Sequence, residues 1–81
     1  MYKMLILEDE IWISSLIQSF VKKNFEMVSP IVCCDNGVDA LDILEKETPD
    51  VALIDINVPL LNGLEVIEKA QQNGSRCRFI I

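Results

Sequence analysis

Short apolar runs alternate along this chain with segments whose apolar residues recur at helical spacing. Runs at residues 3–7, Val28–Cys34, Val51–Ile54 and residues 78–81 predict four strands, and the segments between them predict three helices. Strands that alternate with helices form a parallel sheet with helices on both faces. The pattern therefore predicts a doubly wound α/β fold.

Two features of the apolar runs predict the strand order. Val51–Ile54 is uniformly apolar, so we expect it at the centre of the sheet. Pro30 lies within Val28–Cys34 and removes a donor from the hydrogen-bond ladder, which favours a position at the edge of the sheet. If this second strand lies beside the first, the order is 2-1-3-4, and strand order reverses between the first and third strands.

Each predicted helix has one apolar stripe, which should face the sheet. A helix start at Asn36 is indicated by Asp39 three residues later, and Gly63 should open the third helix. The residues that we expect on the inward stripes are Ile13, Leu16, Ile17, Phe20 and Val21 in the first helix, Gly37, Ala40, Leu41 and Leu44 in the second, and Leu64, Ile67 and Ala70 in the third.

Acidic residues directly follow two of the predicted strands. Glu8, Asp9 and Glu10 come after the first run, and Asp55 comes after Val51–Ile54. In an open parallel sheet, ligands bind beyond the carboxyl ends of the strands at the point where strand order reverses. An acid next to a buried strand carries costs of desolvation and charge repulsion that a bound divalent cation offsets. The acids therefore predict a cation site at this edge.

Mg²⁺ prefers octahedral coordination by oxygen and retains waters, which suits such a site. We predict that Asp9 ligates Mg²⁺ directly, Asp55 through one oxygen, Glu8 through water, and Asn57 through its backbone carbonyl. Asp55 could then attack a phosphoryl group with its other oxygen and form an aspartyl phosphate. The alternative is structural: the first acids are a solvated helix start, and Asp55 is an ordinary turn residue.

Composition limits the other classes of function. The chain has 81 residues, enough for one domain, and 13 acids against 7 bases give a net charge of −6, which disfavours direct contact with nucleic acid or an anionic membrane. No apolar run is long enough to span a bilayer. Cys33, Cys34 and Cys77 form no C-x-x-C pair and the chain has no His, so we interpret them as reduced core thiols in a cytoplasmic protein.

Two segments, MLILEDE and VALIDINVPLLNGLEVI, carry a resemblance to a known family, since the second has a Pro four residues after its first Asp and a Gly eight residues after it. DNGVDAL and PDVALID add to the match. Over its whole length the chain resembles the receiver domains of two-component response regulators, which have a flavodoxin-like fold. The resemblance implies that Asp55 is the phosphoacceptor, Glu8 and Asp9 are a metal-binding acidic pair, and a sensor histidine kinase or histidine phosphotransferase is the partner. Such a domain catalyses its own phosphorylation but is not a turnover enzyme.

The chain departs from the family after its fourth strand. Receivers continue with a Ser or Thr at the end of that strand, a fifth strand that ends in Lys, and two further helices, and none of these is in the sequence. We therefore expect residues 1–81 to be the N-terminal part of a receiver domain, impaired in self-phosphorylation and unable to signal alone. We also expect self-association through the exposed edge at Phe79, Ile80 and Ile81.

Two alternative functions remain at this point. A pseudo-receiver would use the same fold for protein contacts without phosphorylation. A phosphatase-like hydrolase would need a second Asp two residues after the first, where this chain has Asn57. Ile11 and Trp12 lie off the predicted stripe of the first helix, so they form either a docking surface for the phosphodonor or a cover over the end of the sheet.

Overall fold

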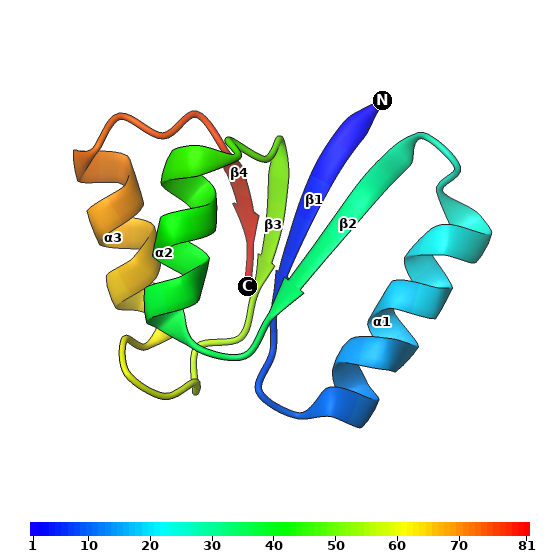
Figure 1. Ribbon diagram of the computed structural model, residues 1–81, viewed down its shortest axis with the longest axis horizontal. Coiled ribbons are helices and arrows are strands. Elements are labelled where there is room, and N and C mark those ends of the chain that lie inside the picture. Colours follow the sequence, from blue (N-terminus) through cyan, green and yellow to red (C-terminus); the bar gives the residue numbers. More distant parts are fainter.

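The computed structural model describes all residues, 1–81, and consists of one parallel sheet and three helices (Figure 1). The sheet has the strand order β2-β1-β3-β4. This confirms the predicted fold, the central position of the third strand and the edge position of the second. The strands are β1 (Tyr2–Leu7), β2 (Val28–Cys34), β3 (Val51–Ile54) and β4 (Arg78–Ile80), and the helices are α1 (Ile11–Asn24), α2 (Gly37–Lys46) and α3 (Gly63–Gln72).

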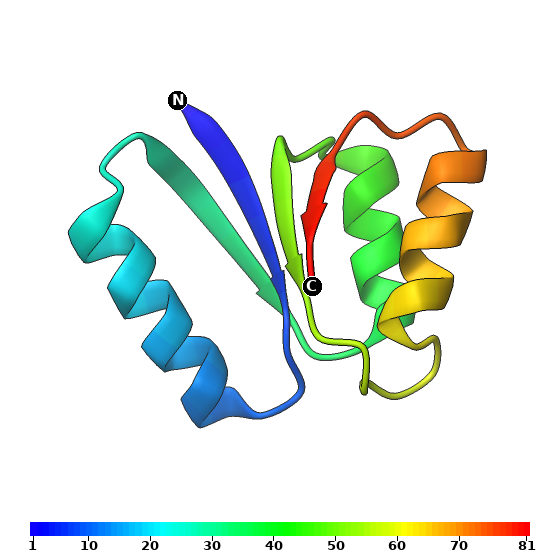
Figure 2. The same ribbon diagram turned by 180° about the vertical axis from the view of Figure 1, so that it is seen from behind.

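The helices divide unequally between the two faces of the sheet. Helices α2 and α3 cover one face, and α1 lies alone on the other (Figures 1 and 2). Successive residues of β1 alternate between these faces, as strand geometry requires. Leu5 and Leu7 belong to a core of nine buried residues beneath α2 and α3, whereas Met4 and Ile6 join Val21 of α1 in a core of three.

The inward faces of the helices were predicted correctly only in part. In α2, Gly37, Ala40 and Leu44 are buried as expected. In α1, however, Leu16 and Phe20 are each 61% exposed. In α3, Ala70 is buried as expected, but Leu64 is 53% exposed, and Val66, which was not predicted to face inward, is fully buried. Helical spacing identifies stripes, but only the position of the sheet decides which stripe faces inward.

The three cysteines are free thiols, as predicted, but they are not all in the core. Cys34 and Cys77 are partly buried, whereas Cys33 is exposed, although Cys33 and Cys34 are neighbours on the edge strand β2. Burial is the main reason that the pKa of Cys34 rises to about 12 and that of Cys77 to about 11, so both remain protonated at neutral pH. None of the helices combines the length and the apolar character needed to cross a membrane.

Candidate metal centre

The acids predicted from the sequence meet at the carboxyl ends of β1 and β3. Leu7 and Ile54 are register partners, so the residues that follow them leave the sheet at the same level. The Asp55 N–H donates to the Leu7 carbonyl (3.0 Å), and the Glu8 N–H donates to the Cys34 carbonyl (3.1 Å). These two bonds extend the ladder by one step and hold both acidic residues at the lower edge of the sheet in Figure 1.

Three carboxylates gather at this edge. Oxygen atoms of Glu8, Asp9 and Asp55 all lie within 4.8 Å of one another. Glu8 and Asp55 are partly buried, and Asp9 is exposed. The structure therefore brings together the three acids that the sequence singled out, from two segments separated by more than half of the chain.

The electrostatics of the cluster are unfavourable without a cation. The pKa of Glu8 is raised from its ordinary value of 4.5, mainly because burial disfavours the charged form. A hydrogen bond from the Glu10 N–H (3.1 Å) opposes the rise, while the charge of Asp55 and hydrogen bonds to Asp9 and Asp55 add to it. The two ion pairs of the chain, Lys3 with Glu47 and Lys46 with Asp42, lie elsewhere. The three acids thus have no basic partner.

Asn57 lies where the chain turns away from the site. Its N–H donates to Asp55 Oδ1 (3.1 Å), which orients the carboxylate of Asp55. Glu8, Asp55 and Asn57 all line a hollow of about 350 Å³. Asn57 is therefore positioned beside the acids, at the spacing that the sequence indicated.

The start of α3 fixes the segment that carries Asp55. A Cβ atom at Gly63 would lie only 2.6 Å from the Asp55 carbonyl oxygen and 2.6 Å from Ile54 Cγ2, so no larger residue fits there without movement. The Gly63 N–H donates to the Ile56 carbonyl (2.9 Å). Asn62 and Glu65 form a reciprocal capping box at the same helix start, with bonds of 3.1 and 2.9 Å. This capping box was not predicted, although the spacing of Asn62 and Glu65, three residues apart, is a sequence signal for it.

The loop between β3 and α3 is also held by α2. The Gly37 N–H, at the first turn of α2, donates to the Pro59 carbonyl (3.2 Å), and the backbone of Leu61 leaves no space for a side chain at Gly37. Leu60, which lies between Pro59 and Leu61, has a φ of 73°, in the left-handed region that non-glycine residues rarely adopt. The loop is therefore fixed by both neighbouring helices, and the backbone strain is concentrated at Leu60.

The two apolar residues that follow the acids point outward. Ile11 is exposed, and Trp12 is 65% exposed, with its Nε1–H donating to Glu10 Oε2 (3.0 Å). Trp12 is too exposed to cover the end of the sheet. The exposure of Ile11 and Trp12 favours a contact surface beside the acidic cluster over a cover for the end of the sheet.

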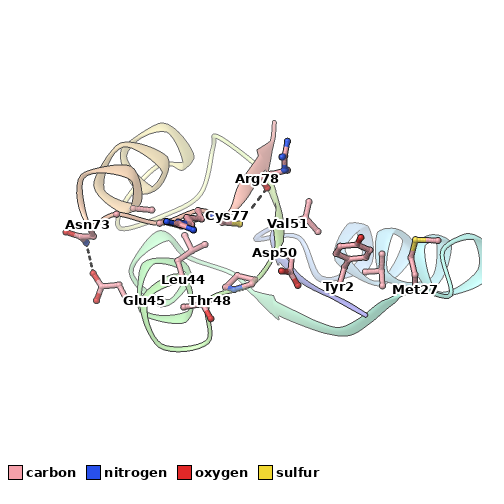
Figure 3. A pocket seen from close by; sticks show the side chains of 16 residues that line it. Tyr2, Met27, Leu44, Glu45, Thr48, Asp50, Val51, Asn73, Cys77 and Arg78 are labelled. Atoms are coloured by element: carbon pink, nitrogen blue, oxygen red, sulfur yellow. Dashed lines mark hydrogen bonds between the residues drawn. The ribbon is translucent and has the colours of Figure 1, made fainter.

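The largest cavity lies at the opposite edge, where the strands begin (Figure 3). It has a volume of about 880 Å³, and the first residues of β1, β3 and β4, which are Tyr2, Val51 and Arg78, help to line it. Asn73, directly after α3, and Glu45 of α2 both line this cavity, and a hydrogen bond of 2.6 Å from the Asn73 side chain to the Glu45 carboxylate links the ends of the two helices (Figure 3). None of the three clustered acids lines this cavity.

Comparison with known proteins identifies the family. The sequence-family model of the response regulator receiver domain matches residues 4–81 of this chain. The chain belongs to this family. Receiver domains act in two-component signalling, bind Mg²⁺ at an acidic pocket and interact with histidine kinases or phosphotransferases.

The relatives are longer than this receiver chain. It is 32% identical over 80 residues to sporulation initiation phosphotransferase F of Bacillus subtilis, an alignment that covers 98% of this chain and 61% of that protein. It is 33% identical over 79 residues to the regulator of RpoS of Escherichia coli K12, covering 98% of this chain and 23% of that protein. The receiver domain of Francisella response regulator 1452 has the same fold, with a TM-score of 0.90 at 22% identity over 100% of this chain and 64% of that one.

Proposed function

We propose that this receiver chain accepts a phosphoryl group at Asp55 from a phosphohistidine of a sensor histidine kinase or histidine phosphotransferase. The observation that carries the proposal is the group of carboxylates from Glu8, Asp9 and Asp55 within 4.8 Å of one another, at the point where strand order reverses. A reducing cytoplasm is the proposed location, and it suits a chain with three free thiols.

The donor set suits Mg²⁺. Three carboxylates without a basic partner offer the hard oxygen ligands that this ion prefers. We assign Asp9 and Asp55 as direct ligands, Glu8 as a ligand through water, and the backbone carbonyl of Asn57 as the fourth protein group. The bound ion would supply positive charge for the oxygens of the transferring phosphoryl group.

The chemistry of transfer then falls to Asp55. One carboxylate oxygen forms a bond to phosphorus while the bond between phosphorus and the donor imidazole nitrogen breaks, and that nitrogen keeps the electron pair. The Asn57 N–H holds Oδ1 in place, so the carboxylate is oriented before the donor arrives. The product is an aspartyl phosphate.

We further propose that residues 1–81 accept the phosphoryl group slowly on their own. Neither ion pair of the chain brings a lysine to the acidic cluster, and no lysine directly follows a strand. A single preorganised electrostatic contact in a transition state is worth about 3 kcal/mol. Without such a contact, transfer depends on the cation and on Asp55 alone.

Exposed Trp12 next to the cluster supports a role in docking the protein donor. Trp12→Ala should slow transfer from a phosphohistidine protein and leave transfer from a small acyl phosphate unchanged. If the protein donor phosphorylated the wild type and Trp12→Ala at equal rates, Trp12 would have no role in docking the donor.

The decisive experiment is incubation of the chain with Mg²⁺ and a small acyl phosphate, followed by mass spectrometry. We expect the mass of one phosphoryl group on the wild type, none on Asp55→Asn, and an unchanged yield for Asp42→Asn, which removes an exposed aspartate on α2. Mg²⁺ should also quench the fluorescence of Trp12, and Asp9→Asn should abolish the quenching. Neither labelling nor quenching in the wild type would instead favour the pseudo-receiver, a protein-contact module that is not phosphorylated.

A further inference from the structure

Strand β2 forms the edge of the sheet beside α1, and its second half presents unpaired backbone groups (Figures 1 and 2). Its register with β1 is regular from Ile31 to Cys34, and the irregular step, with Pro30, comes before Ile31. The Glu8 N–H donates to the Cys34 carbonyl (3.1 Å), so the backbone of Cys34 faces β1. Because successive residues of a strand alternate in direction, the N–H and C=O groups of Ile31 and Cys33 point away from the sheet.

Nothing in the chain pairs with these outward groups. None of the backbone hydrogen bonds outside the regular helices and strands involves Ile31 or Cys33, and Cys33 is exposed. In the flavodoxin-like order 2-1-3-4-5 the fifth strand joins the sheet beyond β4, so β2 is an edge in a longer receiver as well. The open stretch of β2 is therefore available to a strand from outside the domain.

A hollow of about 580 Å³ lies along this edge, between α1 and α2. The polar residues that the two helices contribute to it differ in charge. They are Ser14, Ser15 and Gln18 on α1, and Asp39 and Asp42 on α2. A strand added to β2 would therefore have a neutral surface on one side and an acidic surface on the other.

The acids of the hollow have little compensating charge. The hollow is lined by four acids and no base, the acids being Glu8, Asp35, Asp39 and Asp42. Asp42 pairs with Lys46 (2.9 Å), whereas Asp35 and Asp39 accept hydrogen bonds only from the neutral side chain of Asn36 (2.9 Å each). Burial raises the pKa of the Cys34 thiol to about 12, and the charges of Asp39 and Asp35 add to the rise. The hollow is a region of negative potential.

We propose that the edge of β2 from Ile31 to Cys34 binds an extended segment of a partner protein that carries Lys or Arg at every second position. The backbone of the segment pairs with the outward groups of Ile31 and Cys33. Ile31 packs against the core beneath α1, and Cys34 packs against the core beneath α2 and α3. An added strand has the same alternation, so every second side chain lies on the α2 side, toward Asp39.

Charge makes a basic segment the occupant that fits this edge. Symmetric pairing with β2 of a second copy would bring Asp35 and Asp39 of both copies together, in chains that each have a net charge of −6. Nucleic acids and anionic membranes have the same sign of charge as the hollow. Binding at this edge goes beyond the proposed phosphorylation and does not require it.

The test uses two short synthetic peptides of equal composition, one in which threonine and lysine alternate and one in which the lysines form a single block. Their dissociation constants are measured by fluorescence anisotropy in excess Mg²⁺, which fills the proposed cation site. We expect the alternating peptide to bind at least about threefold more tightly, because only its lysines all lie on the α2 side. At saturation, hydrogen exchange followed by NMR should slow at the Ile31 and Cys33 amides and change little at Val32 and Cys34, which already face β1.

Two variants test the acidic side and the strand edge separately. Asp39→Asn should raise the dissociation constant of the alternating peptide about twofold to fivefold, whereas Glu68→Gln, which removes an exposed charge from α3 outside the hollow, should leave it unchanged. Cys33→Pro should weaken binding and keep the circular dichroism of the wild type, because the N–H that it removes pairs with nothing in the sheet. If Cys33→Pro does not fold, the alternating peptide with N-methylated backbone groups replaces it and should bind more weakly.

Four results would overturn the proposal. The first is equal affinity for the two peptides, or equal effects of Asp39→Asn and Glu68→Gln, since either would mean a general attraction to an acidic chain. The second is loss of binding in Mg²⁺, which would place the peptide on the acidic cluster. The third is unchanged hydrogen exchange at Ile31 and Cys33. The fourth is slower exchange there when the chain is concentrated without peptide, which would assign the edge to a second copy.

Discussion

At the scale of single residues, the ionisation of Glu8 in the acidic cluster changes the folding stability of the chain. Its pKa is raised above 4.5 by burial and by the neighbouring acids, so the folded chain binds this proton more tightly than the unfolded chain. The stability that Glu8 contributes is therefore fully present below pH 4.5, and it is lost as the pH rises through the folded-state pKa. At neutral pH the ionised Glu8 destabilises the metal-free fold.

Glu8→Gln removes this ionisation. In EDTA near neutral pH, the variant should unfold at a higher temperature than the wild type, because the cost of a partly buried charge beside Asp55 is gone. The difference should shrink as the pH falls through the folded-state pKa of Glu8 toward 4.5, and excess Mg²⁺ should reduce it by stabilising the wild type more than the variant. Thermal unfolding followed by circular dichroism measures this, and a difference that does not change with pH would contradict it.

Leu60 is a second residue whose environment the structure defines. Its φ of 73° costs a non-glycine residue about 1 kcal/mol, and its side chain is 74% exposed, so little packing is lost when it is removed. Leu60→Gly should leave the free energy of unfolding unchanged or raise it by up to about 1 kcal/mol. Leu64→Gly is the matched control inside α3 and should lower it by about 1 kcal/mol. Urea denaturation measures both, and a loss of stability in Leu60→Gly as large as that in Leu64→Gly would contradict the assignment of strain.

At the scale of elements, the contact between α3 and β3 couples helix packing to the site. Gly63→Ala places a methyl group 2.6 Å from the Asp55 carbonyl oxygen, so the helix or the loop must move. We expect a loss of about 1 to 3 kcal/mol in the free energy of unfolding, together with weaker Mg²⁺ binding, because Asp55 moves with its backbone.

Gly74→Ala is the control for that substitution. Gly74 has a φ of 85°, and a Cβ there meets nothing within 4 Å, so alanine adds backbone strain of about 1 kcal/mol far from the acids. Its Mg²⁺ affinity, measured by Trp12 fluorescence, should equal that of the wild type. If Gly63→Ala also kept full affinity, the close contact would not position Asp55.

The elements themselves were largely predictable from the sequence, and their faces were not. The bounds of β2 and β3 match the apolar runs, and β4 ends one residue before the predicted Ile81. Leu16, Phe20 and Leu64 were placed inward wrongly because adjacent stripes on a short helix are both partly apolar. The choice between them depends on where the sheet lies, which is a long-range property.

At the scale of the whole molecule, the meeting of the acids could be predicted because it depends only on strand order. Parallel strands end at one edge, so placing β1 beside β3 is sufficient to bring Asp9 near Asp55. The loop that orients Asp55 could not be predicted in the same way. The φ of Leu60 and the close approach of Gly63 arise from the packing of α2 and α3 on the loop, which no local pattern encodes.

The unequal coverage of the sheet predicts unequal local stability. Val21 is the only buried residue of α1, and its core has three buried residues, whereas the core beneath α2 and α3 has nine. Native-state hydrogen exchange should therefore show α1 amides opening at a lower free energy than those of β1, β3 and α2. Val21→Ala should lower the opening free energy of α1 by about 1 kcal/mol or more, because the valine side chain leaves a cavity against Met4 and Ile6. If α1 and β3 amides instead exchanged at one common free energy in both proteins, the chain would open as a single unit, and the weaker core would not limit α1.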